Sequence, residues 1–341
     1  FRYPLAAQTG KVTDAGWGKQ VNAQQLPIST GIAGVLMELQ PGAIRELHWH
    51  ANAAEWGYVI DGQLRVTLFD PEQRISIAEL ATGDVYYFPR GYAHAIQNSG
   101  ATPATFILLF DNGEFSEYAT FSLTDWLAHT PRPILAETLQ VDETALAGLP
   151  TGEVYIIPGP IPPPLDEDRP LTPQKIAANS CAYAFSQQPV ERYPGGTLKI
   201  VGQEQFPLST TITGAVLTID PGAFREPHWH PDAAEWIYVL QGSLRLTIFA
   251  SQGHVRSEEF GVGDVGYVPE GLGHFLENTG EDELRLLLGF NTGNYQQISL
   301  SGWLGANPRQ LVATNLALDL ETVDAFPGDT EYIPEGRDTS A

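Results

Sequence analysis

The sequence has a single cysteine, few basic residues and no long apolar run, and each shortage argues against a class of protein. One cysteine, Cys181, permits neither an intrachain disulfide nor a thiolate metal cluster. The 18 Lys and Arg residues against 41 Asp and Glu residues give a formal net charge of −23, so no nucleic acid or anionic membrane is expected as a partner. No stretch of about 18 apolar residues occurs, and we therefore expect no membrane-spanning helix.

The composition is otherwise that of a globular protein built from short elements. Hydrophobic residues make up 43% of the 341 residues and charged residues 17%, which is typical of a folded chain. The length suits two domains, each large enough to bury a core. The 34 glycines and 26 prolines favour many short strands and turns over long helices.

The chain contains one unit twice. The segment GVLMELQPGAIRELHWHANAAEW begins at Gly34, and GAVLTIDPGAFREPHWHPDAAEW begins 180 residues later at Gly214. Further along, SLTDWLAHTP at Ser122 and SLSGWLGANP at Ser299 are 177 residues apart, so the second copy lacks three residues. Together with the proline-rich stretch 158–170, the repeat predicts domains over 1–165 and 181–341, joined by a linker over 166–180.

Each copy has the pattern of β-strands. Leu64, Val66 and Leu68 alternate with their neighbours at a period of two, and turn signals recur about every ten residues, which is typical of a closed antiparallel sandwich or barrel. Short helices are expected over 141–149, capped by Asp142, and over 319–326. The sequence therefore predicts an all-β fold with a few short helices.

Six of the eight histidines fall at matching positions of the two copies. Each copy has the order His-x-His-x4-Glu, with a third His 39 residues after the Glu. Residues i and i+2 of a strand share a face, so these side chains are expected to converge as a metal site, although an isolated buried histidine is more often a core residue. An N/O donor set without sulfur leaves manganese, iron, zinc, nickel and copper open. The predicted ligands are His48, His50, Glu55 and His94 in the first copy, and His228, His230, Glu235 and His274 in the second.

An arginine stands three residues before the first histidine of each set. Arg45 and Arg225 are at an odd offset, which strict strand alternation would turn away from the site, and we expect the preceding Pro-Gly turn to redirect them. A guanidinium beside an open metal position would bind a carboxylate with two hydrogen bonds. The alternative is an exposed strand arginine.

Two copies of PGA-x-RE-x-HWH-x4-EW, each followed by a Gly-Asp turn and a later histidine, resemble the bicupin family of oxalate decarboxylases over nearly the whole chain. The resemblance implies two tandem cupin barrels of the double-stranded β-helix (jelly-roll) type with manganese in both. It implies decarboxylation of oxalate to formate and carbon dioxide, with dioxygen required, and a trimeric or hexameric assembly. Arg45 would hold oxalate, with Arg225 as its counterpart.

The segment 110–131 is similar to the lid region of that family, where a Ser-Glu-Asn-Ser-Thr segment presents a glutamate over the first metal. Here Glu117 keeps the glutamate, and Tyr118 and Ala119 replace Asn-Ser. A carboxyl group on a mobile lid can give and take the proton of the reaction, so Glu117 is the predicted acid and base. In the second copy Gln297 stands opposite Glu117, so the first barrel is the expected catalyst. Glu277, three residues after His274, is a rival acid for the second site.

Other functions stay open at this stage. The Tyr118-Ala119 replacement allows an oxalate oxidase that produces hydrogen peroxide, and two complete ligand sets allow a manganese-binding or storage bicupin. Dioxygenases of larger aromatic substrates are disfavoured, because the lid and Arg45 suit a small dicarboxylate. A chain that starts at Phe1 suggests a removed leader, so we favour a periplasmic or secreted location over the cytoplasm.

Overall fold

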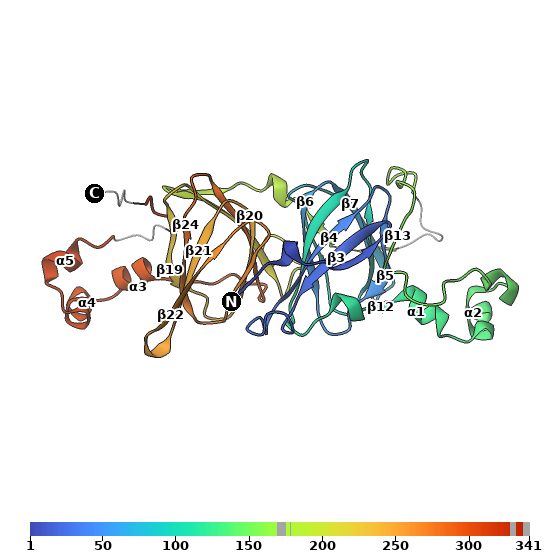
Figure 1. Cartoon of the computed structure of the whole chain (residues 1–341), viewed down its shortest axis with the longest axis horizontal. Coiled ribbons are helices and arrows are strands. Elements are labelled where there is room, and N and C mark those ends of the chain that lie inside the picture. Colours follow the sequence, from blue (N-terminus) through green and yellow to red (C-terminus); the bar gives the residue numbers. More distant parts are fainter. Residues whose placement is uncertain (169–174, 178, 328–331, 337–341) are drawn as a thin grey trace.

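The structure is a computed structural model, and it describes residues 1–168, 175–177, 179–327 and 332–336. Two β-barrels lie next to each other along the long axis, with short helices at the two outer ends (Figure 1). The predicted all-β fold with a few short helices is confirmed. The predicted linker 166–180 lies partly outside the described residues.

The first barrel consists of two facing sheets. One has the order β15-β9-β6-β11-β4-β3-β2, and the other has the order β12-β5-β10-β7-β8-β14, with β13 also paired to β5. The bounds of the strands from the first copy and the linker are β2 (Lys11–Thr13), β3 (Gly16–Val21), β4 (Ala33–Leu39), β5 (Ile44–Trp49), β6 (Glu55–Asp61), β7 (Gln63–Phe69), β8 (Arg74–Ala81), β9 (Val85–Phe88), β10 (Ala93–Asn98), β11 (Ala104–Phe110), β12 (Phe121–Ser122), β13 (Ile156–Ile157) and β14 (Lys175–Ile176).

The second barrel repeats this arrangement. Its sheets have the orders β1-β23-β20-β25-β18-β17-β16 and β22-β21-β24-β19-β26. The bounds of its own strands are β16 (Glu191–Tyr193), β17 (Gly196–Val201), β18 (Thr213–Ile219), β19 (Phe224–Trp229), β20 (Glu235–Gln241), β21 (Leu244–Ala250), β22 (His254–Phe260), β23 (Val265–Val268), β24 (Gly273–Asn278), β25 (Leu284–Phe290) and β26 (Ile298–Ser299).

The barrels exchange their first strands. β1 (Arg2–Tyr3), at the start of the chain, pairs with β23 of the second barrel. β15 (Ala182–Tyr183), at the start of the second copy, pairs with β9 of the first barrel. The start of each copy therefore belongs structurally to the other barrel. The domain boundaries at 165 and 181 stay a prediction.

A shared hydrophobic core joins the barrels. It contains buried side chains of both copies, among them Trp56 and Trp236. A Cβ added at Gly214 would lie 2.1 Å from the ring of Trp56, and one added at Gly34 would lie 2.4 Å from the ring of Trp236. Each barrel therefore inserts one indole against a glycine of the other, and the glycines leave the space that close packing requires.

The sequence predicted only some of the helices. The helices are α1 (Leu123–Ala128), α2 (Arg132–Leu139), α3 (Leu300–Ala306), α4 (Arg309–Leu316) and α5 (Leu320–Asp324). The expected helix at 319–326 is α5, whose Asp319 side chain accepts a hydrogen bond from the Thr322 amide. The expected helix at 141–149 is one 3-10 turn over Glu143–Leu146; Asp142 stands at its N-cap position as predicted, but its side chain accepts no capping hydrogen bond. The unpredicted α1 and α3 begin after Ser122 and Ser299, whose hydroxyls cap them.

Replacing Gly214 by Ala tests the packing between the barrels. The added methyl group overlaps the Trp56 ring, and such overpacking costs about 1–3 kcal/mol of stability. We expect a lower unfolding temperature by differential scanning calorimetry, and an unchanged one for Gly261→Ala, where nothing lies within 4 Å. Equal unfolding temperatures for both variants would contradict this account of the interface.

Candidate metal centres and lid

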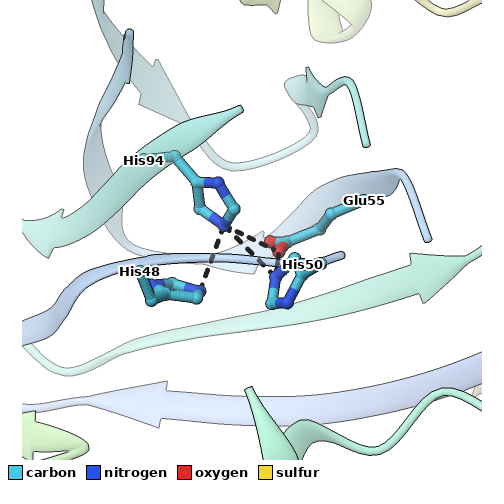
Figure 2. Close-up of side chains that lie close together, drawn as sticks. All are labelled: His48, His50, Glu55 and His94. Carbon is cyan, nitrogen blue, oxygen red and sulfur yellow. Dashed lines mark hydrogen bonds and ion pairs between the residues drawn. The ribbon is translucent and has the colours of Figure 1, made fainter. Parts of the chain in front are cut away.

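The four predicted ligands of the first barrel converge inside it (Figure 2). His48 lies on β5 and pairs in register with His94 on β10, His50 follows the end of β5, and Glu55 is the first residue of β6. Their ligand atoms all lie within 4.8 Å of one another, and all four side chains are buried. We call this group the first centre.

Imidazole nitrogens lie unusually close together in the first centre. The Nε2 atom of His94 is 3.1 Å from that of His48 and 3.2 Å from that of His50. The Oε2 atom of Glu55 is 2.8 Å from His50 Nε2 and 3.4 Å from His94 Nε2. Three nitrogens and one oxygen thus point at one small volume.

The protonation of these groups suits metal binding. Burial lowers the pKa of His48 well below its ordinary value, helped by the charge of Arg45. Burial also lowers the pKa of His50 to about 4, although its hydrogen bond to Glu55 acts in the opposite direction. Burial alone would raise the pKa of Glu55, but the neighbouring His50 and His94 side chains hold it well below its usual range. At neutral pH His48 and His50 are therefore neutral imidazoles, and Glu55 is a carboxylate.

Backbone carbonyls fix which nitrogen carries the proton. The Nδ1 atom of His48 donates to Glu46 O at 2.5 Å, and that of His94 donates to Tyr92 O at 2.9 Å, because a carbonyl oxygen can only accept. Both Nε2 atoms then carry lone pairs that face each other with no proton between them. A cation between these atoms removes that repulsion, so the donor set fits a divalent metal ion with N and O ligands.

The second barrel holds an equivalent group, which we call the second centre. It consists of His228, His230, Glu235 and His274. Glu235 Oε2 lies 3.1 Å from His230 Nε2 and 2.8 Å from His274 Nε2. Burial lowers the pKa of His228 well below its ordinary value, and the two other histidines hold that of Glu235 low against the effect of burial. The second centre therefore has the same donor chemistry.

Arg45 reaches the site by a β-bulge. On β10, His94 and Ile96 pair with His48 and Arg45 of β5, so between these pairs two residues of β5 lie opposite one residue of β10. The extra residue reverses the alternation and turns Arg45 inward, where it is fully buried. Arg225 has the same irregularity between its pairing with Leu276 and that of His228. The expected inward direction is right, but its cause is the bulge and not the Pro-Gly turn.

Glu117 is buried and paired with Arg45. Its Oε1 atom lies 2.8 Å from Arg45 Nε, only 1% of the residue is exposed, and Oε2 has no hydrogen-bond partner among the described residues. Burial raises the pKa of the Glu117 carboxyl; the charge of Arg45 opposes this shift and that of Glu55 adds to it. Arg45 also donates to Thr120 Oγ1 at 2.9 Å, so the lid segment 116–120 is closed.

Comparisons with known proteins place the chain in a family. The cupin family model matches residues 6–146 and 182–324. The oxalate decarboxylase OxdC of Bacillus subtilis is 42% identical over 96% of this chain and 84% of its own. An oxalate decarboxylase of Arthroderma benhamiae is 32% identical over 98% of this chain and 84% of its own.

The chain belongs to the cupin family and, within it, to the oxalate decarboxylases. A solved structure of the Bacillus subtilis oxalate decarboxylase at pH 4.6 is 38% identical and superposes with a TM-score of 0.94, over 98% of this chain and 87% of that one. Another, with a TM-score of 0.94 over 98% and 89% of the two chains, comes from work on the Mn(II) centres of that enzyme. The two predicted cupin barrels are therefore confirmed.

The first and second centres differ most at the lid. In the second barrel Gln297 occupies the place of Glu117: its Oε1 atom accepts hydrogen bonds from Arg225 and, at 2.7 Å, from the Tyr295 hydroxyl. The sequence alignment predicted this correspondence. Gln297 offers an acceptor but no carboxyl group beside the second centre.

Glu277 does not lie in the second centre. On β24 the buried residues His274, Leu276 and Asn278 alternate with outward-facing ones, and Glu277 is one of the latter. Its carboxylate lies 4.0 Å from Arg245, at the partly exposed outer face. The suggestion of a second-site acid at Glu277 is therefore wrong, because an odd offset from His274 on a regular strand leads to the other face.

Sequence analysis missed two tyrosines at the first centre. The Tyr86 hydroxyl donates to Glu55 Oε1 at 2.7 Å, and a Cβ at Gly57 would lie 2.1 Å from the Tyr86 ring. At these two positions the second copy has Gly266 and Ile237, so the large side chain stands on the opposite strand. This paired difference between otherwise similar copies was the available signal.

Tyr155 contacts Arg45 with both its ring and its backbone carbonyl. Its ring centroid is 4.6 Å from the guanidinium carbon, and its carbonyl accepts from Arg45 Nη1 at 3.5 Å. The backbone of Tyr155 has φ of +64°, a strained value for a tyrosine. Tyr332 lies likewise 4.8 Å from Arg225, so the recurrence of tyrosine 177 residues later was a readable signal.

The remaining expectations concern positions outside the two centres. His129 and His254, the two histidines without a counterpart in the other copy, are exposed. Within the described residues, no helix is long and apolar enough to cross a membrane.

Replacing His94 by Ala tests the first centre. Loss of one of four ligands should empty that centre and leave the second intact, so bound metal should fall from two ions per chain to one. Elemental analysis of dialysed protein gives the count, and the exposed His129→Ala is the matched control. Two bound ions in the His94 variant would contradict the assignment.

Proposed function

We propose that the protein is a manganese-dependent oxalate decarboxylase, which converts the oxalate dianion and one proton to formate and carbon dioxide. The observation that carries the proposal is the buried Arg45–Glu117 pair beside a three-histidine, one-glutamate centre. The relatives that span most of the chain are named oxalate decarboxylases, which supports the same reaction.

Manganese would be held by the first and second centres. When bound, it supplies one-electron redox chemistry and a positive charge for a substrate carboxylate. A divalent ion held by three imidazole ligands and a single carboxylate keeps a net positive charge, which favours a dianion as a further ligand.

Arg45 would hold the oxalate. Its guanidinium is fully buried and faces the first centre from the bulge in β5. In such an interior, charge-assisted hydrogen bonds to a carboxylate are strong and set its orientation. The Tyr155 ring and carbonyl would keep the guanidinium in place while substrate replaces Glu117 as its partner.

Glu117 would transfer the proton. Carbon–carbon cleavage leaves a one-carbon fragment that needs a proton on carbon to become formate, and a buried acid with a raised pKa can hold that proton. The unpartnered Oε2 atom is free to present it. The closed lid keeps water out of the site during this step.

Oxalate oxidase is the second candidate. That reaction converts oxalate, dioxygen and two protons to two molecules of carbon dioxide and one of hydrogen peroxide, and it needs no proton on carbon. Tyr118 and Ala119 stand in the lid where the family resemblance implies Asn-Ser, and this departure is the reason to measure hydrogen peroxide beside formate. Dioxygen is also part of the proposed decarboxylation, as a partner without net consumption. A manganese-storage function differs from both because it predicts full metal and no turnover.

The first centre is proposed as the catalytic one. Gln297 has no proton to give at neutral pH, so the second centre would be structural or weakly active. A trimeric or hexameric assembly and a periplasmic or secreted location, with the cytoplasm as alternative, complete the proposal. Size-exclusion chromatography with light scattering, and fractionation of the native source, test these two points.

Replacing Glu117 by Gln tests the function. Loss of a general acid and base lowers rates by about 100-fold or more, so formate from isotopically labelled oxalate should nearly disappear while the manganese content stays constant. Glu114→Gln, an exposed carboxylate of the same loop, should keep full activity. If the Glu117 variant still makes formate at the original rate, the proposed role is wrong; if the unaltered protein makes only hydrogen peroxide, it is an oxidase.

A further inference from the structure

The lid is held by strand β3, at two points that the first barrel alone possesses. The Gln20 side chain, only 6% exposed, accepts hydrogen bonds from the Glu117 amide at 3.0 Å and the Ser116 hydroxyl at 3.3 Å. The Tyr118 hydroxyl donates to Gly18 O at 2.9 Å. One anchor thus lies on each side of the Glu117 side chain, and both belong to the same short strand.

A comparison of the two copies shows which hydrogen bonds around Gln20 are common to both barrels and which occur only beside the lid. Gln8 donates to Gln20 O at 2.9 Å and accepts from the Gln20 amide, and in the second copy Gln188 donates to Ile200 O at 2.7 Å. This backbone contact is therefore common to both barrels. The side chain of Gln20 is not, because the equivalent residue is Ile200.

The other anchor is also specific to the first copy. The three residues that the second copy lacks are the counterparts of Tyr118, Ala119 and Thr120, and Leu198 replaces Gly18. Both anchors therefore occur where the lid carries a carboxyl group, and both are missing where it carries Gln297. A buried glutamine in a barrel wall costs desolvation unless it is paired, so its presence only opposite the lid indicates a lid function.

We propose that Gln20 and Tyr118 are positioning residues that keep the Glu117 carboxyl over the first centre, and so favour protonation of the one-carbon fragment over its oxidation by dioxygen. This inference rests on the proposed function. Neither residue touches the ligands or Arg45 in the described contacts; both act through the lid backbone and the Tyr118 ring. Loss of an anchor leaves the site chemically complete but open for longer.

The lid itself can be followed without turnover. Hydrogen–deuterium exchange of a peptide that contains residues 116–120 reports the opening of the lid, because the Glu117 amide is bonded to Gln20. Loss of one neutral hydrogen bond shifts an equilibrium by roughly two- to tenfold, and we expect exchange to accelerate by about that factor in Gln20→Leu and Tyr118→Phe. Metal-free and manganese-loaded protein should both show the acceleration.

Products and controls complete the experiment. With oxalate and dioxygen, both variants should yield more hydrogen peroxide per formate by a similar factor, with KM for oxalate unchanged because Arg45 is intact. Gln20→Glu keeps an acceptor oxygen and should restore slow exchange and the original product ratio. Ile200→Leu and Tyr193→Phe, in the second barrel, should change neither quantity.

The outcomes are distinguishable. Unchanged exchange in both Gln20→Leu and Tyr118→Phe overturns the anchors, and faster exchange with an unchanged product ratio overturns their part in the reaction. Tyr118→Phe removes only the hydroxyl of a partly exposed side chain, so it decides the question even if Gln20→Leu fails to fold. If the unaltered protein makes no formate, the proposed function fails, while the exchange data still decide whether the anchors hold the lid.

Discussion

Lone pairs of imidazole nitrogens that face each other without a proton between them dominate the interior of the first barrel. In the first centre, backbone carbonyls take the Nδ1 protons of His48 and His94, and the Nε2 atoms are left 3.1 Å apart. Burial lowers the pKa of His48, so protonation of His48 does not relieve the contact at neutral pH. The barrel walls therefore impose a geometry that a cation completes, and the surrounding sheets supply the rigidity to maintain it.

This constraint explains why two nearly identical barrels can differ in chemistry without differing in fold. The ligands, the buried arginines and the tyrosines beneath them occur in both copies. Three differences around the centres are Tyr86 bonded to Glu55, Gln20 bonded to the lid, and Glu117 in place of glutamine. Each polar group added in the first barrel has a partner there, and each is replaced in the second by an apolar residue or an amide. The duplicated chain thus provides its own comparison between a metal centre with an acid and one without.

The sequence was informative where a pattern repeats and silent where geometry departs from regular alternation. Two copies of His-x-His-x4-Glu were enough to predict the ligand clusters, because strand periodicity places i and i+2 on one face. The same rule fails for Arg45, since a bulge in β5 adds a residue, and bulges leave no clear signature in one sequence. The rule holds for Glu277: its odd offset from His274 on a regular strand places its side chain on the outer face, beside Arg245. The exchange of β1 and β15 depends on contacts between the copies, which local patterns do not report.

The net charge of −23 acts against a dianionic substrate only outside the barrels. Surface charges are screened within a Debye length of about 8 Å at physiological ionic strength, whereas interactions between buried groups are screened much less. Arg45 is fully buried, and a metal ion in the first centre would be equally enclosed, so their attraction for oxalate is undiminished by the acidic exterior. The acidic surface therefore affects how often an anion arrives rather than how firmly it is held. In such a protein the discrimination between anions is made by the closed lid and the buried guanidinium, and the rate of encounter rises with added salt.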